Sequence, residues 1–290
     1  MADKRAPSGS LYVVATPIGN LDDLTPRALK TLQRVDLIVA EDTRHTRRLL
    51  EAQGIQKKLI SCHEHNEGRR AEALVARLLQ GAHIALVTDA GTPTISDPGY
   101  RLVRAAAAKG LPVVPIPGVS AAIAALSASG LATDSFTFIG FPARSKAKRM
   151  RQLETLAVSS HTLIFFQAPH RLVAFVHELI AAMGDRPAVL ARELTKMHEE
   201  FIRSPLSQMA ARLEQREKIR GECTLIVSGA SVIQPTETDL HTALTKELEA
   251  ADRSLSQVAR TLAREFNLPR SEVYSKALKL RDLHHKKHER

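Results

Sequence analysis

Tryptophan is absent from this sequence of 290 residues, and other aromatic residues are few, with three tyrosines and eight phenylalanines. Such a chain has little material for the stacking platforms with which single-strand nucleic-acid binders hold bases. No apolar run approaches the roughly 18 residues that a membrane-spanning helix needs, and the polar start MADKRAPSGS has no apolar core of a secretion signal. We therefore expect a soluble, cytoplasmic protein that has no membrane partner.

Cysteine is also scarce. Cys62 and Cys223 are the only two cysteines and lie far apart, which leaves no disulfide framework and suits a reducing compartment. Cys62 stands near His63 and His65, but one thiol and two imidazoles lack the fourth ligand of a zinc site. We expect no metal and interpret this stretch as the end of a surface strand, where either histidine remains a candidate proton acceptor.

Several signatures of nucleotide binding and hydrolysis are missing as well. No G-x-G occurs, which excludes the dinucleotide fingerprint and the usual Gly-rich loop of Rossmann methyltransferases. There is also no P-loop and no G-x-S-x-G elbow. A small ligand with an adenosine portion is compatible with these absences, but motif spacing by itself does not identify it.

Positive charge, by contrast, is in excess. Lysine and arginine number 41 against 31 aspartate and glutamate, so the formal net charge is +10 and the isoelectric point is near 9.9. Such a balance favours partners that carry phosphate groups. The chain is longer than one average domain, which suggests two compact domains and an appendage.

Strands and helices alternate along the first half of the chain. Residues 11–16 (LYVVAT) are typical of a buried strand, residues 25–35 of a helix with Thr25 as N-cap and Pro26 at its first position, and residues 36–42 of the next strand. The alternation continues to the strand PVVPIPG. Apolar strands separated by single helices predict an α/β fold with a mostly parallel sheet covered on both faces.

The composition changes near Asp134, where a basic stretch runs to Arg151 before a second αβ pattern begins. A polar, proline-containing linker and three predicted helices follow this pattern. We predict a disordered N-terminus (1–10), two α/β domains (11–130 and 131–232) and a C-terminal helical module (240–290) that has a positive surplus.

Three strands of the first half end in small loops rich in glycine and proline, at residues 15–25, 88–99 and 115–122. Ligands of open α/β sheets bind beyond the carboxyl ends of the strands. Glycine lets the backbone approach a ligand or take positive φ, and proline fixes the loop shape. Any one of these loops could equally be an ordinary tight turn between a strand and a helix. Three such loops on one sheet indicate a ligand site.

Seven motifs follow one another between Leu11 and about Ala230, namely TPIGNLDDLT, AEDTRHT, TDAGTPTISDPGY, PIPGVSA, FFQAPHR, ARELTK and GECTLIVSG. They resemble the tetrapyrrole methylase superfamily, and more closely its branch that 2′-O-methylates a cytidine in the decoding region of 16S rRNA. This resemblance implies two consecutive α/β domains of tetrapyrrole methylase type with S-adenosylmethionine in the cleft between them. It also implies a homodimer, a helix-turn-helix-like C-terminal extension, and 16S rRNA of the small ribosomal subunit as partner.

Matched motif by motif, the resemblance implies a cofactor pocket built from both α/β domains. One departure is Gln167, where relatives commonly have glutamate, so this chain lacks a charge there. The implied cofactor-binding residues are Pro17, Ile18, Gly19, Asp89, Ala90, Gly91, Thr92, Pro93, Ile95, Pro117, Gly118, Ser120, Ala121, Phe166, Arg192 and Glu193, with Gly221 and Glu222 nearby.

Transfer of a methyl group to a ribose oxygen is an in-line displacement that needs no metal, so positioning supplies most of the acceleration. A base that takes the hydroxyl proton adds about 10²–10⁴-fold. Asp42 is also a natural cap for the helix that follows it. The candidate bases are Glu41, Asp42, His63 and His65, and the sequence does not choose among them.

Basic residues supply the predicted RNA contacts, because phosphate neutralisation dominates nucleic-acid affinity. Arg44 alternatively pairs with a carboxylate, the basic run with Arg144 is alternatively a solvated loop, and Arg192, Glu193 and Lys196 alternatively form an internal set of ion pairs. The predicted RNA-binding residues are Arg44, His45, Arg144, Lys146, Lys148, Arg149 and Arg151.

Other functions stay open on these residues. A methylase of a tetrapyrrole precursor, corrin or sirohaem, would also need basic residues, for substrate carboxylates. A non-catalytic RNA- or ribosome-binding factor would bind without turnover, and the C-terminal helices could read DNA. The sequence also leaves open whether free rRNA or the assembled subunit is the substrate, and whether the C-terminal module grips RNA or forms the dimer contact.

Overall fold

The computed structural model describes residues 8–63, 66–230, 237–249, 254–266 and 268–288. The chain divides into two compact units, one ending at Ala230 and the other beginning at Ser231. The candidate base His65 and most of the predicted disordered N-terminus lie outside the described residues.

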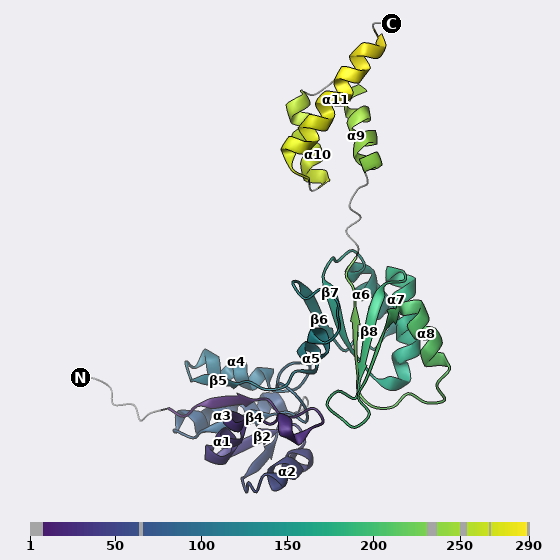
Figure 1. The fold of residues 1–290 in the computed structure, drawn as a ribbon. Helices are drawn as coiled ribbons and strands as arrows, with labels where there is room; N and C mark the ends of the chain where they lie inside the picture. The colour runs from purple at the N-terminus through teal and green to yellow at the C-terminus, as the bar shows by residue number, and fades with distance from the viewer. Residues whose placement is uncertain (1–7, 64–65, 231–236, 250–253, 267, 289–290) are drawn as a thin grey trace, which may run out of the picture. The chain divides into compact units, whose positions relative to one another are not determined.

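A five-stranded sheet forms the first half of the larger unit (Figure 1), with the strand order β3-β2-β4-β1-β5 and every pairing parallel. The central strands β2 and β4 are buried along their whole length. The parallel sheet predicted from the apolar runs is therefore confirmed. Its strands are β1 (Leu11–Val14), β2 (Leu37–Ala40), β3 (Leu59–Ser61), β4 (Ile84–Val87) and β5 (Val113–Ile116).

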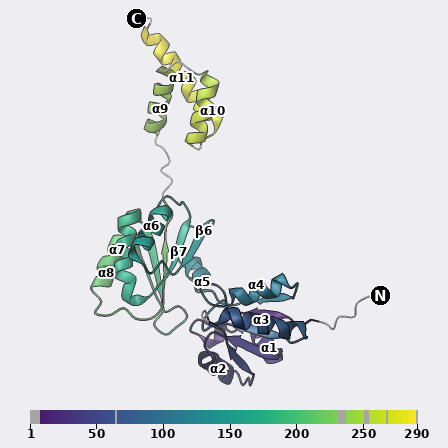
Figure 2. The ribbon, with the colours of Figure 1, turned by 180° about the vertical axis from the view of Figure 1, so that it is seen from behind.

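Helices cover both faces of this first sheet. Successive strand residues point to opposite faces, so Leu37 and Val39 pack with α3 and α4, whereas Ile38 and Ala40 pack with α1 and α2. Helices α3 and α4 lie side by side in both ribbon views (Figures 1 and 2). The predicted cap is present, because the Thr25 side chain accepts a hydrogen bond from the Ala28 amide. The elements are the 3₁₀ helix η1 (Leu21–Asp23), α1 (Pro26–Arg34), α2 (Thr43–Ala52), α3 (Glu67–Leu79) and α4 (Tyr100–Ala108).

The second sheet has the order β6-β7-β10-β8-β9, and only β6 and β7 pair in parallel. Sequence reasoning missed its two edge strands, because β6 lies beside the basic stretch and the polar β9 lacks an apolar run. Helix α8 begins at Leu206, because Ser204 and Pro205 still pair with β8. The strands are β6 (Phe136–Gly140), β7 (Thr162–Gln167), β8 (Pro187–Arg192), β9 (Glu200–Pro205) and β10 (Cys223–Val227).

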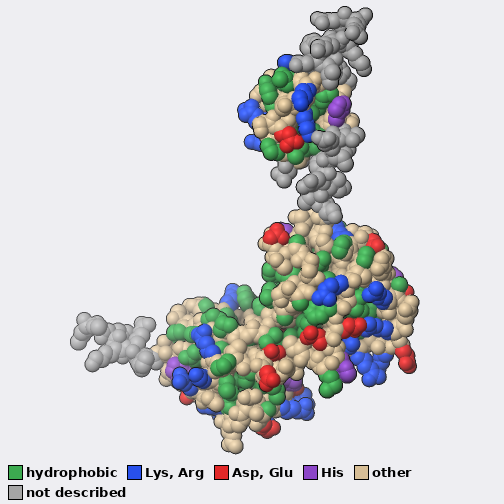
Figure 3. All heavy atoms as spheres, in the orientation of Figure 1, with side chains coloured by type: hydrophobic (Ala, Val, Ile, Leu, Met, Phe, Trp, Pro, Cys, Tyr) green, Lys and Arg blue, Asp and Glu red, His purple; other side chains and the backbone are tan. Residues whose placement is uncertain are grey.

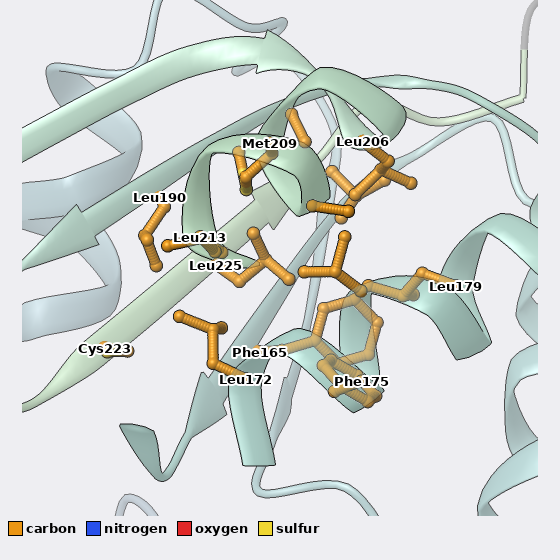
Figure 4. Packing of buried hydrophobic residues seen from close by; sticks show 14 of the residues in the cluster. Phe165, Leu172, Phe175, Leu179, Leu190, Leu206, Met209, Leu213, Cys223 and Leu225 are labelled. Atoms are coloured by element: carbon orange, nitrogen blue, oxygen red, sulfur yellow. The ribbon is translucent and has the colours of Figure 1, made fainter. Parts of the chain in front are cut away.

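Helices α6, α7 and α8 pack on one face of the second sheet and enclose the largest apolar cluster found in the described residues. Phe165 and Phe175 meet edge to face at its centre, with 5.3 Å between ring centroids (Figure 4). Leu179 and Leu206 pack around them and are fully buried. The helical elements are α6 (Lys146–Leu156), the 3₁₀ helix η2 (Pro169–Arg171), α7 (Leu172–Met183) and α8 (Leu206–Glu214).

Helix α5 (Ala121–Ser127) joins the two sheets. It follows β5 of the first sheet, yet Ala122 and Ala125 pack on the second sheet against Ile164 and Ile226. Ile18, from the loop after β1, belongs to the same cluster. The second sheet is therefore covered on both faces, and one apolar cluster holds loops of the first sheet against it.

The described residues of the smaller unit form three helices, as the sequence predicts, and a buried apolar cluster of their own. Lys and Arg side chains lie on its visible surface (Figure 3), and Arg260, Arg264 and Arg270 are exposed. Within the described parts of the chain, no helix is long and apolar enough to cross a membrane. The helices are α9 (Glu237–Glu249), α10 (Leu255–Glu265) and α11 (Arg270–His288).

Candidate active site

The three loops singled out in the sequence meet at one edge of the first sheet, because β4, β1 and β5 are neighbours and run in parallel. Backbone hydrogen bonds of 2.9 and 3.0 Å join Thr16 and Gly91 in both directions. The Thr92 hydroxyl donates to the Val119 carbonyl at 3.1 Å. Three segments far apart in the sequence thus form one continuous surface.

The loop after β4 carries unusual backbone conformations. Gly91 and Gly99 have φ of +82° and +120°, as the predicted use of glycine requires, but Thr94 (+74°) and Ser96 (+68°) also have positive φ. Residues in sparsely populated conformations cost about 1–3 kcal/mol each and cluster at functional sites. Buried Glu67 accepts hydrogen bonds from the amides of Gly99 and Arg101 and so holds the end of this loop.

A cavity of about 410 Å³ lies beside these loops and takes its other wall from the second sheet. That volume is within the usual range of small-molecule sites. Its lining includes the ends of β7 and β10 and the loop residue Leu194. The predicted cofactor-binding residues that line it are Ile18, Asp89, Ala90, Gly91, Thr92, Ile95, Ala121 and Phe166, together with Gly221 and Glu222.

The other predicted cofactor-binding residues do not line the cavity. A Cβ on Gly118 would stand 2.8 Å from the Ala15 Cβ, and one on Gly19 would stand 2.4 Å from the Lys196 Cγ. These two glycines therefore allow close packing within the protein. The predicted residues outside the lining are Pro17, Gly19, Pro93, Pro117, Gly118, Ser120, Arg192 and Glu193.

Aromatic rings form one wall of the cavity. Phe166 meets Phe138 at 5.1 Å and Phe141 at 5.6 Å between ring centroids, both edge to face. Phe141 lines the cavity although it is 62 % exposed. An exposed phenylalanine beside a cavity offers an apolar surface to a planar ring. Sequence reasoning missed Phe141 because it did not identify β6, the strand that precedes it.

Four carboxylates also line the cavity, those of Glu41, Asp89, Asp97 and Glu222. Glu41 accepts a hydrogen bond of 2.8 Å from the Thr88 hydroxyl, and Asp89 accepts one of 3.1 Å from the Asp42 amide. Burial, followed by repulsion from Glu41, raises the pKa of Asp97 to about 6. A carboxyl with a pKa near neutrality inside a cavity is suited to general base work. Sequence reasoning missed Asp97, whose SDPG setting is that of an ordinary turn.

The other candidate bases lie elsewhere. Asp42 caps α2 by accepting from the Arg44 amide at 2.8 Å, and it pairs with the Arg44 guanidinium at 2.6 Å. That pairing holds the pKa of Asp42 well below its ordinary value. His63 is exposed, and its Nε2 lies 2.9 Å from Asn66 Nδ2. Glu41 is thus the candidate base that lines the cavity, and no cluster able to hold a metal is found in the described residues.

Ion pairs fix the loop beside the cavity. Arg192 pairs with Glu200 at 2.9 Å, and Lys196 pairs with Glu193 at 2.8 Å and with Glu222 at 3.2 Å. These contacts draw the loop after β8 toward Glu222, which lines the cavity. The alternative interpretation of ARELTK as an internal set of ion pairs is the arrangement that the structure contains.

The predicted RNA-binding residues fall into two groups. Arg149 is largely buried and pairs with Glu178 at 2.6 Å, so its positive charge is neutralised within the protein. The other six are exposed, and the His45 side chain stands on α2 beside Arg44. The exposed residues are Arg44, His45, Arg144, Lys146, Lys148 and Arg151.

Known proteins share both the sequence and the fold of this chain. Its residues 10–210 match the family model described as Tetrapyrrole (Corrin/Porphyrin) Methylases. Ribosomal RNA small subunit methyltransferase I of Synechocystis is 47 % identical over 94 % of this chain and 98 % of its own length. The protein of the same name from Escherichia coli O157:H7 is 45 % identical, over 93 % and 95 %.

Solved structures agree on the fold. The methyltransferase CobJ superposes with a TM-score of 0.59 at 19 % identity, covering 77 % of this chain and 95 % of its own. Uroporphyrin-III C-methyltransferase from Thermus thermophilus, complexed with S-adenosyl homocysteine, gives 0.54 at 18 % identity, covering 76 % and 97 %. The predicted fold class and the family resemblance are confirmed. The chain therefore belongs to the tetrapyrrole methylase family and, within it, to the ribosomal RNA small subunit methyltransferase I proteins.

Proposed function

We propose that this protein methylates the ribose 2′-oxygen of a cytidine in the decoding region of 16S rRNA, with S-adenosylmethionine as methyl donor. One observation carries the proposal: relatives that are 44–51 % identical over 77–94 % of this chain are named as methyltransferases of small-subunit rRNA. Solved structures of uroporphyrin-III C-methyltransferase and of cobalt precorrin-4 methyltransferase are 18–21 % identical to this chain. A tetrapyrrole precursor is therefore the weaker candidate substrate.

The cavity suits the proposed cofactor in its chemistry. Aliphatic side chains and Phe166 offer an apolar surface to an adenine ring and a ribose, and backbone groups near Gly91 can approach closely. Carboxylates in the lining favour a ligand that carries a sulfonium and an amino group. The buried side chain of Gln167, which lines this cavity, accepts a hydrogen bond from the Ala168 amide at 2.9 Å.

The bound cofactor supplies an electrophilic methyl group on sulfur, and the chain's own residues supply position and proton transfer. The 2′-oxygen forms a bond to the methyl carbon as the carbon–sulfur bond breaks, and the hydroxyl proton passes to a base. We assign that base to Asp97, whose raised pKa of about 6 leaves it ionised yet basic at neutral pH. Glu41, already bonded to the Thr88 hydroxyl, is the second choice.

An rRNA substrate also has consequences for which basic residues bind RNA and for where the protein is located in the cell. The exposed basic residues of α6 and α2 suit phosphate contacts, whereas Arg149 is left out because Glu178 neutralises it. A nucleotide within folded rRNA must be drawn from its stack to reach the cavity. We further propose a cytoplasmic location, a homodimer, and domain limits near residues 130 and 232, with the basic C-terminal helices serving the rRNA or the dimer.

The decisive experiment incubates the purified protein with tritiated S-adenosylmethionine and small ribosomal subunits from a strain that lacks this enzyme. Mapping by nuclease digestion and mass spectrometry should place one 2′-O-methylcytidine in the decoding region. Free 16S rRNA, tested in parallel, identifies the form of the substrate. Cofactor binding without label on either RNA would contradict the proposal and direct the search to tetrapyrrole precursors or to a non-catalytic role.

A further inference from the structure

A second cavity, of about 300 Å³, adjoins the candidate active site on the side of the second sheet. Gln167 lines both cavities, so they share a wall. Arg144, Arg149 and Arg171 line the second cavity, and Glu178 is the one acidic residue in its lining. The lining therefore carries a net positive charge, unlike the acidic lining of the first cavity.

One arginine of the three is already neutralised. Arg149 donates to both carboxylate oxygens of Glu178, at 2.6 and 2.8 Å, and this pairing holds the pKa of Glu178 below its ordinary value. Arg149 also donates to the carbonyls of Ala143 and Arg144, at 2.8 and 3.0 Å. The largely buried pair therefore holds the backbone of the segment that carries Arg144.

The other two arginines have no such partner. The side chains of Arg144 and Arg171 are exposed, and neither guanidinium makes a hydrogen bond or an ion pair with any described residue. They come from different elements, Arg144 from the segment between β6 and α6 and Arg171 from the end of η2. Two such guanidinium groups at one cavity suit the oxygens of a phosphate, which they bind in a fork geometry.

We propose that this second cavity binds the phosphodiester next to the ribose that is methylated. The inference rests on the proposed function. In RNA, the carbon that bears the 2′-oxygen is bonded to the carbon whose oxygen carries the next phosphate. A ribose that reacts in the first cavity must therefore place a phosphate close by, and the cavity behind Gln167 is the basic neighbour. Arg144 and Arg171 hold the phosphate, and the Arg149–Glu178 pair positions Arg144.

The test compares the full-length protein with Arg144→Ala, Arg171→Ala and the double variant in methyl transfer to small ribosomal subunits. The control is Arg104→Ala, an exposed arginine on α4 that lines neither cavity. The double variant should raise KM for subunits about 10- to 100-fold, as expected for charged hydrogen bonds, with kcat within about twofold. Binding of S-adenosylmethionine, measured by calorimetry, should stay unchanged in every variant.

Salt dependence separates a phosphate contact from a general loss of structure. Because the double variant loses one phosphate contact, its binding to RNA releases fewer counterions. The slope of log KM against log salt should therefore be lower by about one than in the wild-type protein. It should not change in Arg104→Ala. An intermediate KM for Arg171→Lys would support the fork geometry, since lysine keeps the charge and loses the second hydrogen bond.

The outcomes separate this inference from the function on which it rests. Methylation by the wild-type protein, with KM and salt slope unchanged in the double variant, would overturn the phosphate site alone. Absence of methylation by the wild-type protein, despite cofactor binding, would overturn the proposed function and this inference with it.

Discussion

Replacement of Asp97 by asparagine tests the proposed base directly. Asparagine has almost the same shape but cannot accept the hydroxyl proton, so kcat should fall by about 10²–10⁴-fold. KM for S-adenosylmethionine should change by only a few-fold, because the cavity keeps its shape. The measurement is steady-state methyl transfer to small ribosomal subunits. The matched control is Asp134→Asn, an exposed aspartate outside the lining, which should behave as wild type.

The pH dependence of kcat provides an independent test of Asp97 as the base. Asp97 must be ionised to accept a proton, so kcat of the wild-type protein should rise with pH, with a midpoint near its pKa of about 6. Burial and the neighbouring carboxylates Glu41 and Asp89 all raise this pKa. Asp97→Asn should lose this midpoint, and retention of kcat within fivefold with the same pH profile would refute the assignment.

The same carboxyl should also lower the stability of the fold. The folded protein holds the Asp97 proton more tightly than the unfolded chain, from the ordinary value of 3.8 to about 6, so stability falls as pH rises through this window. Two pKa units correspond to about 3 kcal/mol at most, and partial solvent screening reduces this to roughly 1–3 kcal/mol. Urea unfolding should show Asp97→Asn more stable than wild type at pH 8 and equal to it at pH 3.5.

Three further substitutions test other parts of the structure. Asp42→Asn keeps the cap acceptor of α2 and lies outside the cavity lining, so methyl transfer should stay within about twofold of wild type; a 100-fold loss would restore Asp42 as the base. Gly118→Ala forces its Cβ against Ala15 and should cost about 1–3 kcal/mol in urea unfolding, and an unchanged midpoint would argue against the close contact. Phe175→Ala leaves a cavity at the centre of the apolar cluster between the second sheet and helices α6, α7 and α8. It should lower the free energy of unfolding by about 3–5 kcal/mol, whereas a decrease below 1 kcal/mol would contradict the packing.

The elements of the first sheet were predictable because their signals are local. The cap at Thr25 and Pro26 and the apolar run of β4 each lie within a few residues. In the second sheet, β6 was missed because it lies beside the basic stretch and β9 because it lacks an apolar run, and the positions of both depend on pairing with β7 and β8. A strand of that kind is defined by its neighbour more than by its own sequence.

The sequence by itself determined the family, the parallel first sheet and the three glycine- and proline-rich loops at its edge, since short motifs and local backbone preferences carry these features. Only the tertiary structure decided which residues face the cavity. Burial, followed by repulsion from Glu41, raises the pKa of Asp97, and Glu178 neutralises Arg149; both partners are distant in the chain. Burial and charge act through space, so chain folding sets the distances that raise the pKa of one carboxyl and pair one arginine within the protein.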